Sequence, residues 1–303
     1  MRAWAQAVPK HARVGVLFPG TQASWVGQLG VFRRTLHELE WVEGQNLEFV
    51  FRYADGQYER LPALAAELVA AKPDVIFAGS APAIRAAMQA TTSIPIVFET
   101  FADVVAVGLA RQLGRPGSNV TGVSGFSPEL NAKRLQFMHE MLPRANRFAL
   151  LANLGNPATP PGVQTMEMAA RQLQVAMTVV DVRAPDQLEQ AFEGMVRQRT
   201  QAMVVASDPM LFGHQRRIAD LAASHRLPAA YDARSYVDEG GLMSYGSGHE
   251  RFQQVAGYVD RVLRGAKPAE LPIAQPTRFE LVVNLKAAAA LGLSIPQALL
   301  LRA

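Results

Sequence analysis

The sequence predicts an α/β protein of two lobes, each a parallel sheet covered by helices, with a ligand cleft between the lobes. A short apolar run that ends in a Gly-, Pro- or Asn-rich loop occurs twice, at residues 13–20 (RVGVLFPG) and 147–157 (RFALLANLGNP). After each run, buried β-type segments alternate with segments of helical period. That alternation is typical of parallel sheets with helices on both faces.

The first half contains five predicted strands and four predicted helices. Apolar or period-two segments predict strands at residues 13–18, 46–53, 74–78, 94–98 and 120–124. Segments with apolar residues at helical spacing predict helices at residues 25–40, 57–71, 79–91 and 104–113. The pair Lys72-Pro73 ends the second helix, because proline cannot continue a helix.

The second half repeats that order of elements. Strands are predicted at residues 147–152, 175–182, 202–206 and 227–231, and helices at 160–173, 185–199 and 209–225. The tail adds strands at 240–246 and 279–284, a helix at 250–264 and a small alanine-rich helix. We expect the tail to cross between the lobes, which gives residues 10–122 plus 247–272 as lobe 1 and 123–246 plus 273–303 as lobe 2.

Composition excludes several classes of function. The chain has 303 residues, 49% of them hydrophobic and 18% charged, and no apolar run approaches the ~18 residues of a membrane span. It has no cysteine, which removes thiol nucleophiles, disulfides, zinc–thiolate sites and iron–sulfur clusters. The net charge of +4 comes from scattered basic residues, so nucleic acid is not an expected partner.

The sequence also lacks the familiar catalytic signatures. No G-x-G-x-x-G follows the first strand, and there is no G-x-x-x-x-G-K-[ST], H-E-x-x-H or G-x-S-x-G. The six histidines are dispersed, without metal-ligand spacing. We therefore expect no cofactor, no metal and no catalytic residue, although a triad assembled from distant residues stays open as an alternative.

Ligands of open parallel sheets bind outside the carboxyl ends of the strands, so the loops there contain the candidate contacts. The first half contributes Thr21, Gln22, Ser80, Ala81, Thr100, Phe101 and Asp103. The second half contributes Asn153, Asn156, Asp208, Tyr231, Arg234 and Tyr245.

Three of these residues have predicted roles toward charged groups. Thr21, Ser80 and nearby helix N-termini suit a ligand carboxylate, and Asp208 suits an ammonium group. Each of the three is equally suited to capping a helix or a turn. We expect a composite site, in which neither half of the chain binds well alone.

Aromatic and basic candidates complete the predicted site. Phe101, Tyr231 and Tyr245 suit the apolar or aromatic body of a ligand. Arg234 suits either a carboxylate or a structural pair with Asp232 or Glu239, and the pair is slightly favoured.

Four long phrases, at residues 32–87, 95–143, 239–246 and 275–296, resemble the ABC-transporter substrate-binding family that includes TrpX-like tryptophan-binding proteins. The resemblance extends from about residue 11 to residue 300. It implies a type I periplasmic-binding-protein fold, in which two Rossmann-like lobes joined by three crossings close over a small ligand. It also implies a membrane permease as partner and an amino acid, especially an aromatic one, or a small aromatic carboxylate as ligand.

Export to the periplasm follows from the same resemblance, and it makes Ala5-Gln6-Ala7 a candidate signal-peptide remnant. We expect the exported protein to act as a monomer. The sequence departs from the family where Ala102-Asp103-Val104 replaces a common Gly-Asp-Pro, and where Glu99 puts a negative charge near the expected pocket. A ligand-sensing domain of the same fold is the main alternative function, and an α/β enzyme is a weaker one.

Overall fold

The computed structural model describes residues 11–125, 127–248 and 250–303. The chain forms two compact units, Met1–Gly125 with His249–Pro276 (unit 1) and Phe126–Gly248 with Thr277–Ala303 (unit 2). The lobe boundaries predicted from the sequence differ from these crossings by up to four residues (272 against 276) and stay a prediction. The candidate signal remnant lies outside the described residues.

Unit 1 contains a five-stranded parallel sheet in the order β2-β1-β3-β4-β5. All five strands were predicted from the sequence. Their bounds are β1 (Ala12–Phe18), β2 (Leu47–Tyr53), β3 (Val75–Gly79), β4 (Ile96–Thr100) and β5 (Val120–Ser124). The edge strand β5 is covered by the returning chain, since Ser124 N donates to Ala274 O and Ala274 N donates to Gly122 O.

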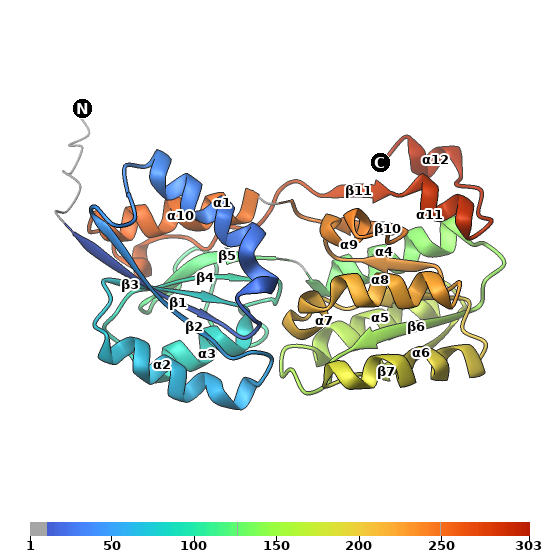
Figure 1. Ribbon diagram of the computed structural model, residues 1–303, viewed down its shortest axis with the longest axis horizontal. Helices are drawn as coiled ribbons and strands as arrows, with labels where there is room; N and C mark the ends of the chain where they lie inside the picture. Colours follow the sequence, from blue (N-terminus) through green and yellow to red (C-terminus); the bar gives the residue numbers. More distant parts are fainter. Residues whose placement is uncertain (1–10, 126, 249) are drawn as a thin grey trace. The chain divides into compact units, whose positions relative to one another are not determined.

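Helices cover both faces of this sheet (Figure 1). The helices α1 (Val26–Glu38) and α10 (Glu250–Leu263) pack on one face, and α2 (Leu61–Ala70) and α3 (Ala81–Ala90) pack on the other. The rings of Phe32 and Phe252 both contact Phe77 of β3, with centroids 4.8 and 6.2 Å away. Residues 250–263 therefore belong to the core of a unit whose strands all precede residue 125.

The helix predicted at residues 104–113 is wrong, because this segment forms turns. The Asp103 carboxylate accepts hydrogen bonds from Val105 N and Ala106 N, which starts a single turn. Gly108 then adopts a φ of 72°, a left-handed conformation that cannot continue an α-helix. The apolar residues Val104 and Leu109 are buried within this loop rather than on a helical face.

Unit 2 contains a six-stranded sheet in the order β11-β10-β9-β8-β6-β7. Its strands are β6 (Arg147–Ala152), β7 (Ala176–Asp181), β8 (Ala202–Val205), β9 (Ala229–Tyr231), β10 (Met243–Gly246) and β11 (Glu280–Val283). The first five are parallel, as predicted. β11 runs antiparallel to β10, so the purely parallel sheet expected from the alternation becomes a mixed one at its edge.

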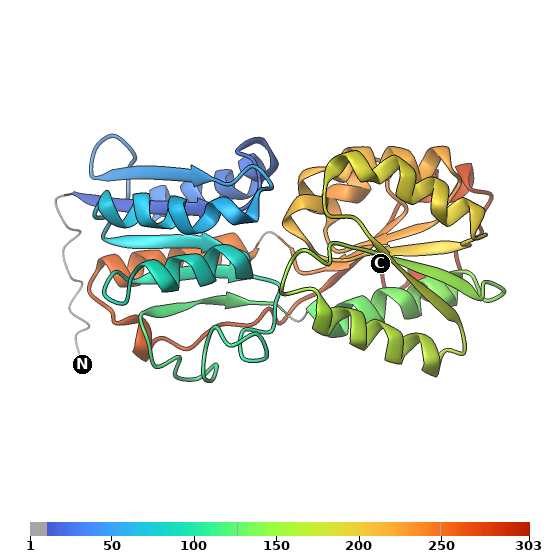
Figure 2. The ribbon, with the colours of Figure 1, turned by 90° about the horizontal axis from the view of Figure 1, so that it is seen from below.

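Helices also cover both faces of the second sheet, and Figure 2 shows them above and below its strands. One face is covered by α4 (Ser127–Met141), α5 (Pro160–Gln172), α11 (Leu285–Ala290) and α12 (Gln297–Leu300). The other is covered by α6 (Leu188–Arg197), α7 (Pro209–Gly213), α8 (Gln215–Ser224) and α9 (Arg234–Asp238). No helix in the described parts of the chain is long and apolar enough to span a bilayer.

Two features of unit 2 differ from the sequence-based expectation. The helix predicted over residues 209–225 is two helices, separated at His214, whose φ of −116° is not helical. The helix α4 was not predicted, although its buried residues Leu130, Leu135, Met138 and Met141 recur at helical spacing. Because α4 was not predicted, Arg134 on this helix was not considered as a candidate from the sequence.

A substitution of Gly122, inside β5, tests how tightly the strands of the first sheet pack. A Cβ at this position would lie 2.1 Å from the Phe98 carbonyl oxygen, and the φ of 151° suits only glycine. We expect Gly122→Ala to lower the free energy of unfolding by about 2–4 kcal/mol in urea titrations. The control is Gly30→Ala in α1, where the nearest atom is the Arg34 side-chain end at 3.7 Å. That change is expected to stabilise by about 0.5–1 kcal/mol, and equal effects of the two variants would contradict the prediction.

Candidate functional site

Ser80 lies at the carboxyl end of β3 and precedes α3. Its φ of 69° and ψ of 155° are unusual for a residue other than glycine, and its backbone N–H donates to Glu99 O at 2.7 Å. The hydroxyl does not cap the helix, and it has no hydrogen-bond partner among the described residues. A strained residue with an unused buried hydroxyl at a helix N-terminus is arranged to bind a group that accepts hydrogen bonds.

A buried ion pair lies beside Ser80. Glu99 of β4 is 2% exposed, and its Oε1 lies 2.6 Å from Arg251 Nη1, at the start of α10. The Arg251 guanidinium also stacks on the half-buried ring of Phe101, with Cζ 3.7 Å from the ring centroid. The negative charge that Glu99 brings to this edge is therefore compensated within unit 1, and Arg251 is a residue that the sequence-based list missed.

Three of the other candidates of unit 1 stabilise turns. Thr21 and Gln22 are exposed, and Thr21 Oγ1 accepts a hydrogen bond from Ser24 N at 3.3 Å. Buried Thr100 accepts one from Ala102 N at 3.1 Å, whereas exposed Asp103 caps the turn after β4. Ala81 is buried as the first residue of α3. Thr21 and Gln22 keep side chains accessible at the strand ends, and Asp103 is committed to its loop.

In unit 2 the structure brings three predicted residues together. Asp208 is buried at the N-terminus of α7, where its Oδ1 accepts hydrogen bonds from Met210 N (2.9 Å) and Leu211 N (3.2 Å). Asn156 Nδ2 donates to Oδ2 at 2.8 Å and Asn153 Nδ2 donates to Oδ1 at 3.4 Å. Asp208 therefore has the capping role, one of the two interpretations of its residue type, with four hydrogen bonds to its carboxylate.

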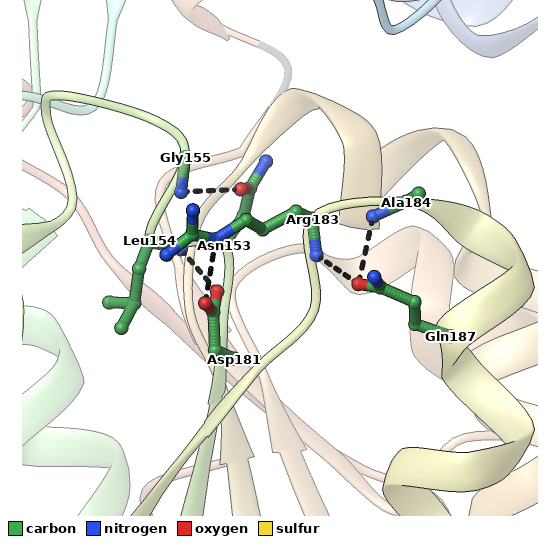
Figure 3. A network of polar contacts seen from close by, with 7 residues as sticks. All are labelled: Asn153, Leu154, Gly155, Asp181, Arg183, Ala184 and Gln187. Atoms are coloured by element: carbon green, nitrogen blue, oxygen red, sulfur yellow. Dashed lines mark hydrogen bonds and ion pairs between the residues drawn. The ribbon is translucent and has the colours of Figure 1, made fainter.

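The loop that supplies Asn153 is itself held in place, as Figure 3 shows. Asn153 Oδ1 accepts a hydrogen bond from Gly155 N at 2.9 Å, and Asp181 at the end of β7 accepts one from Leu154 N at 2.8 Å. Arg183 Nε donates to Asp181 Oδ2 at 2.7 Å. These bonds fix the backbone at the carboxyl ends of β6 and β7. Asn153 therefore stabilises its own loop through Oδ1 and donates to Asp208 through Nδ2.

The aromatic and basic candidates of unit 2 have varied environments. Tyr231 is fully buried and stacks on Tyr236, with ring centroids 4.6 Å apart, and burial raises the pKa of its hydroxyl. Tyr245 is half-buried and packs edge-to-face on Phe137 at 5.0 Å. Exposed Arg234 lies 3.7 Å from Asp238, so the structural pair that we favoured forms with a different acid.

Sequence reasoning missed a second arginine, Arg134 of α4. Its side chain is fully buried, and its Nε donates to Tyr245 O at 2.8 Å. Burial lowers its pKa to about 10, and the nearby Asp232 carboxylate opposes that shift. A single charged residue within an apolar helical stripe was the available signal, and it required α4 to be predicted first.

The polar groups at the strand ends can bind a small molecule. No cluster of three or more His, Asp or Glu side chains that could hold a metal ion occurs within residues 11–125, 127–248 and 250–303. Each unit instead presents hydroxyl, guanidinium and carboxylate groups at the carboxyl ends of its strands. Such groups can form directional hydrogen bonds and ion pairs with a small polar molecule.

Comparison with known proteins is consistent with a binding role. The family described as "ABC transporter substrate binding protein" matches residues 15–303. A tyrosine-binding protein from Clostridioides difficile (strain R20291) is 23% identical over 254 residues, which are 84% of this chain and 73% of that protein.

Solved structures share the fold over nearly the whole chain. A conserved domain protein from Vibrio cholerae has a TM-score of 0.90 and 27% identity, with 97% of this chain and 99% of that one covered. An ABC domain from Streptococcus pneumonia, in complex with L-Trp, has a TM-score of 0.88 and 22% identity, with 97% and 98% covered. These similarities confirm the predicted two-lobed, periplasmic-binding-protein-like fold.

Asp208→Ala tests the capping network of unit 2. The change removes a helix cap and leaves the amides of Asn153 and Asn156 without their shared acceptor, so the free energy of unfolding should fall by about 2–4 kcal/mol. Urea titration measures the loss. Asp103→Ala is the matched control, since Asp103 also accepts two backbone N–H groups but is exposed, and its loss should stay below about 1 kcal/mol. Similar losses would show that burial of Asp208 does not matter.

Glu99→Gln tests the ion pair of unit 1. The neutral amide leaves the Arg251 guanidinium buried without a compensating charge, which should lower the free energy of unfolding by about 3 kcal/mol. A double-mutant cycle with Arg251→Met measures the coupling. We expect the double variant to lose clearly less than the sum of the single variants. Additive losses would mean that the two side chains do not stabilise each other.

Proposed function

This chain belongs to the ABC transporter substrate-binding protein family, and from that premise we propose that it captures an amino acid, or a small aromatic carboxylate, for import. It is a binding component and not an enzyme. The proposal places the protein outside the cytoplasm, where it delivers its ligand to a membrane permease. Capture proceeds by closure of the two units over the ligand, with contacts from both.

The observation that carries the ligand class is the environment of Ser80. Its hydroxyl lacks a partner among the described residues, and it stands at the N-terminus of a ten-residue helix whose dipole favours a negative group. A ligand carboxylate satisfies the hydroxyl and the first N–H groups of α3. The tyrosine- and L-Trp-binding relatives support an amino acid as the molecule that bears this carboxylate.

The aromatic preference rests on Phe101. Arg251 covers its ring at 3.7 Å, and its backbone packs against Gly125, where a Cβ would lie 3.1 Å from Phe101 Cα. A half-buried ring held from two sides is a rigid apolar surface for the body of a ligand. Thr21 and Gln22 supply polar groups at the neighbouring strand end.

A thermal-shift panel of the common L-amino acids and small aromatic carboxylates tests the ligand class. A compound at 100 times its Kd should stabilise the protein by about 2.7 kcal/mol, because it binds only the folded state. Absence of any shift across the panel would refute this ligand class.

Ser80→Ala tests the carboxylate contact with the best compound of that panel. Loss of a hydrogen bond to a charged group costs about 1.5–3 kcal/mol, so Kd measured by calorimetry should rise about tenfold or more. Ser118→Ala is the control, because Ser118 is an exposed serine just before the amino end of β5, whereas the proposed site lies at the carboxyl ends of the strands. An unchanged Kd in Ser80→Ala would remove this hydroxyl from the site.

A further inference from the structure

The amino ends of the strands in unit 2 carry a row of arginines. The parallel strands β9, β8, β6 and β7 are neighbours in that order, so they all begin at the same edge of the sheet. Each strand start contributes basic charge, and we call the five residues the basic edge: Arg226 before β9, Arg199 before β8, Arg144 before β6, Arg147 as the first residue of β6, and Arg171 in the last turn of α5, which leads into β7.

Hydrogen bonds join these strand starts to one another. Arg147 Nε donates to Arg199 O at 2.9 Å. Gln201, just before β8, accepts hydrogen bonds from Asn146 N at 2.9 Å and Arg147 N at 3.1 Å. Asn146 O in turn accepts one from Ala176 N, the first residue of β7, at 2.8 Å. Neighbouring strands lie about 4.8 Å apart, so the four strand starts spread the arginines over roughly 14 Å.

No acid of the chain compensates these charges. All five arginines are exposed, and within the described residues none forms an ion pair of 4.0 Å or less. Glu140, near the end of α4, pairs with Arg302 at 2.9 Å instead. Glu193 of α6 pairs with Arg197 at 3.5 Å, and exposed Glu167 of α5 pairs with no residue of the basic edge. The five positive charges exceed the net charge of the whole chain, +4, so the remainder is close to neutral.

Helix C-termini explain only part of this charge. Helices end at the amino edge of a parallel sheet, and their last carbonyls favour basic residues. Unit 1 has the same architecture, but its amino edge is mixed, because Arg13 there pairs with Glu48 at 3.0 Å and its N–H donates to Asp74. The left-handed residues that follow α1 and α2 are Glu40 and Lys72, whereas those after α6 and α8 both belong to the basic edge.

The basic edge fits anionic phospholipid better than nucleic acid or an acidic protein. Every tyrosine and phenylalanine that the structure describes in unit 2 is buried or half-buried. The row therefore lacks the exposed rings that stack on bases and that anchor protein interfaces. The exposed apolar side chain beside it is aliphatic, Val196 in the last turn of α6, which is 47% exposed. Lipid head groups require only positive charge and a shallow apolar contact.

We propose that the basic edge holds unit 2 against a membrane surface rich in anionic phospholipid. The guanidinium groups donate hydrogen bonds to lipid phosphates, which supply the negative charge that the chain itself does not. The candidate ligand contacts Asn153 and Asp208 follow the opposite, carboxyl ends of β6 and β8, so docking leaves them accessible. Docking goes beyond ligand capture, because it concentrates the protein at a membrane whatever the ligand is.

Co-sedimentation of the full chain with lipid vesicles tests the proposal. Vesicles of phosphatidylcholine with about 30% phosphatidylglycerol are compared with pure phosphatidylcholine, at about 20 mM and about 500 mM NaCl. We expect binding only to the anionic vesicles and its loss at high salt. Each basic residue near such a surface strengthens binding by roughly fivefold, so a triple variant with Arg147→Gln, Arg199→Gln and Arg226→Gln should bind at least about tenfold more weakly. The corresponding triple lysine variant keeps the charge and should stay within about threefold of the wild type.

The matched control removes three charges elsewhere, with Arg34→Gln, Arg111→Gln and Arg115→Gln at exposed positions of unit 1. It should lower vesicle binding by less than about threefold. Equal losses in the two glutamine variants would make net charge the cause and overturn the proposal, as would loss of binding in the lysine variant. The wild-type comparison needs no variant: equal binding to both vesicle types, or binding to polyglutamate or DNA but not to anionic vesicles, also overturns it. Ligand capture is measured separately and is unaffected by either result.

Discussion

The candidate site of unit 1 depends on the parallel pairing of β3 with β4. The ladder continues one residue beyond β3, where Ser80 N donates to Glu99 O at 2.7 Å, and this bond holds Ser80 in its left-handed conformation. The same register buries the Glu99 side chain, which forms an ion pair with Arg251, 152 residues later in the chain. Arg251 in turn covers Phe101. The pairing of β3 with β4 thus places the Ser80 hydroxyl, the Glu99–Arg251 ion pair and the Phe101 ring at the carboxyl end of one sheet.

Hydrogen bonding identifies the structural role of Asp208 in unit 2. Asp208 resembles a ligand contact by residue type and position, but its four donors come from its own helix and from two asparagines. Arg134 was not a candidate from the sequence, yet it is fully buried, and its Nε donates to the Tyr245 carbonyl of β10.

The structure also explains how the protein accommodates Glu99, one of the positions at which the sequence departs from the family. Glu99 suggested a negative charge in the pocket, which would repel a carboxylate. In the structure that charge is compensated at 2.6 Å by Arg251, and the two residues are both buried. The Glu99 charge is therefore no argument against the proposed contact of a ligand carboxylate with Ser80 and the N-terminus of α3.

The sequence alone determined the alternation of strands and helices, because apolar period and turn residues are local signals. It therefore predicted all five strands of unit 1, and four long phrases of the sequence carried the resemblance to the family. It placed Ser80 and Phe101 at strand ends for the same reason. Only the tertiary structure decided that residues 104–113 form turns, that β11 is antiparallel and that Asn153 and Asn156 donate to Asp208. Those outcomes depend on contacts between segments distant in the chain, where hydrogen bonding and burial override local preference.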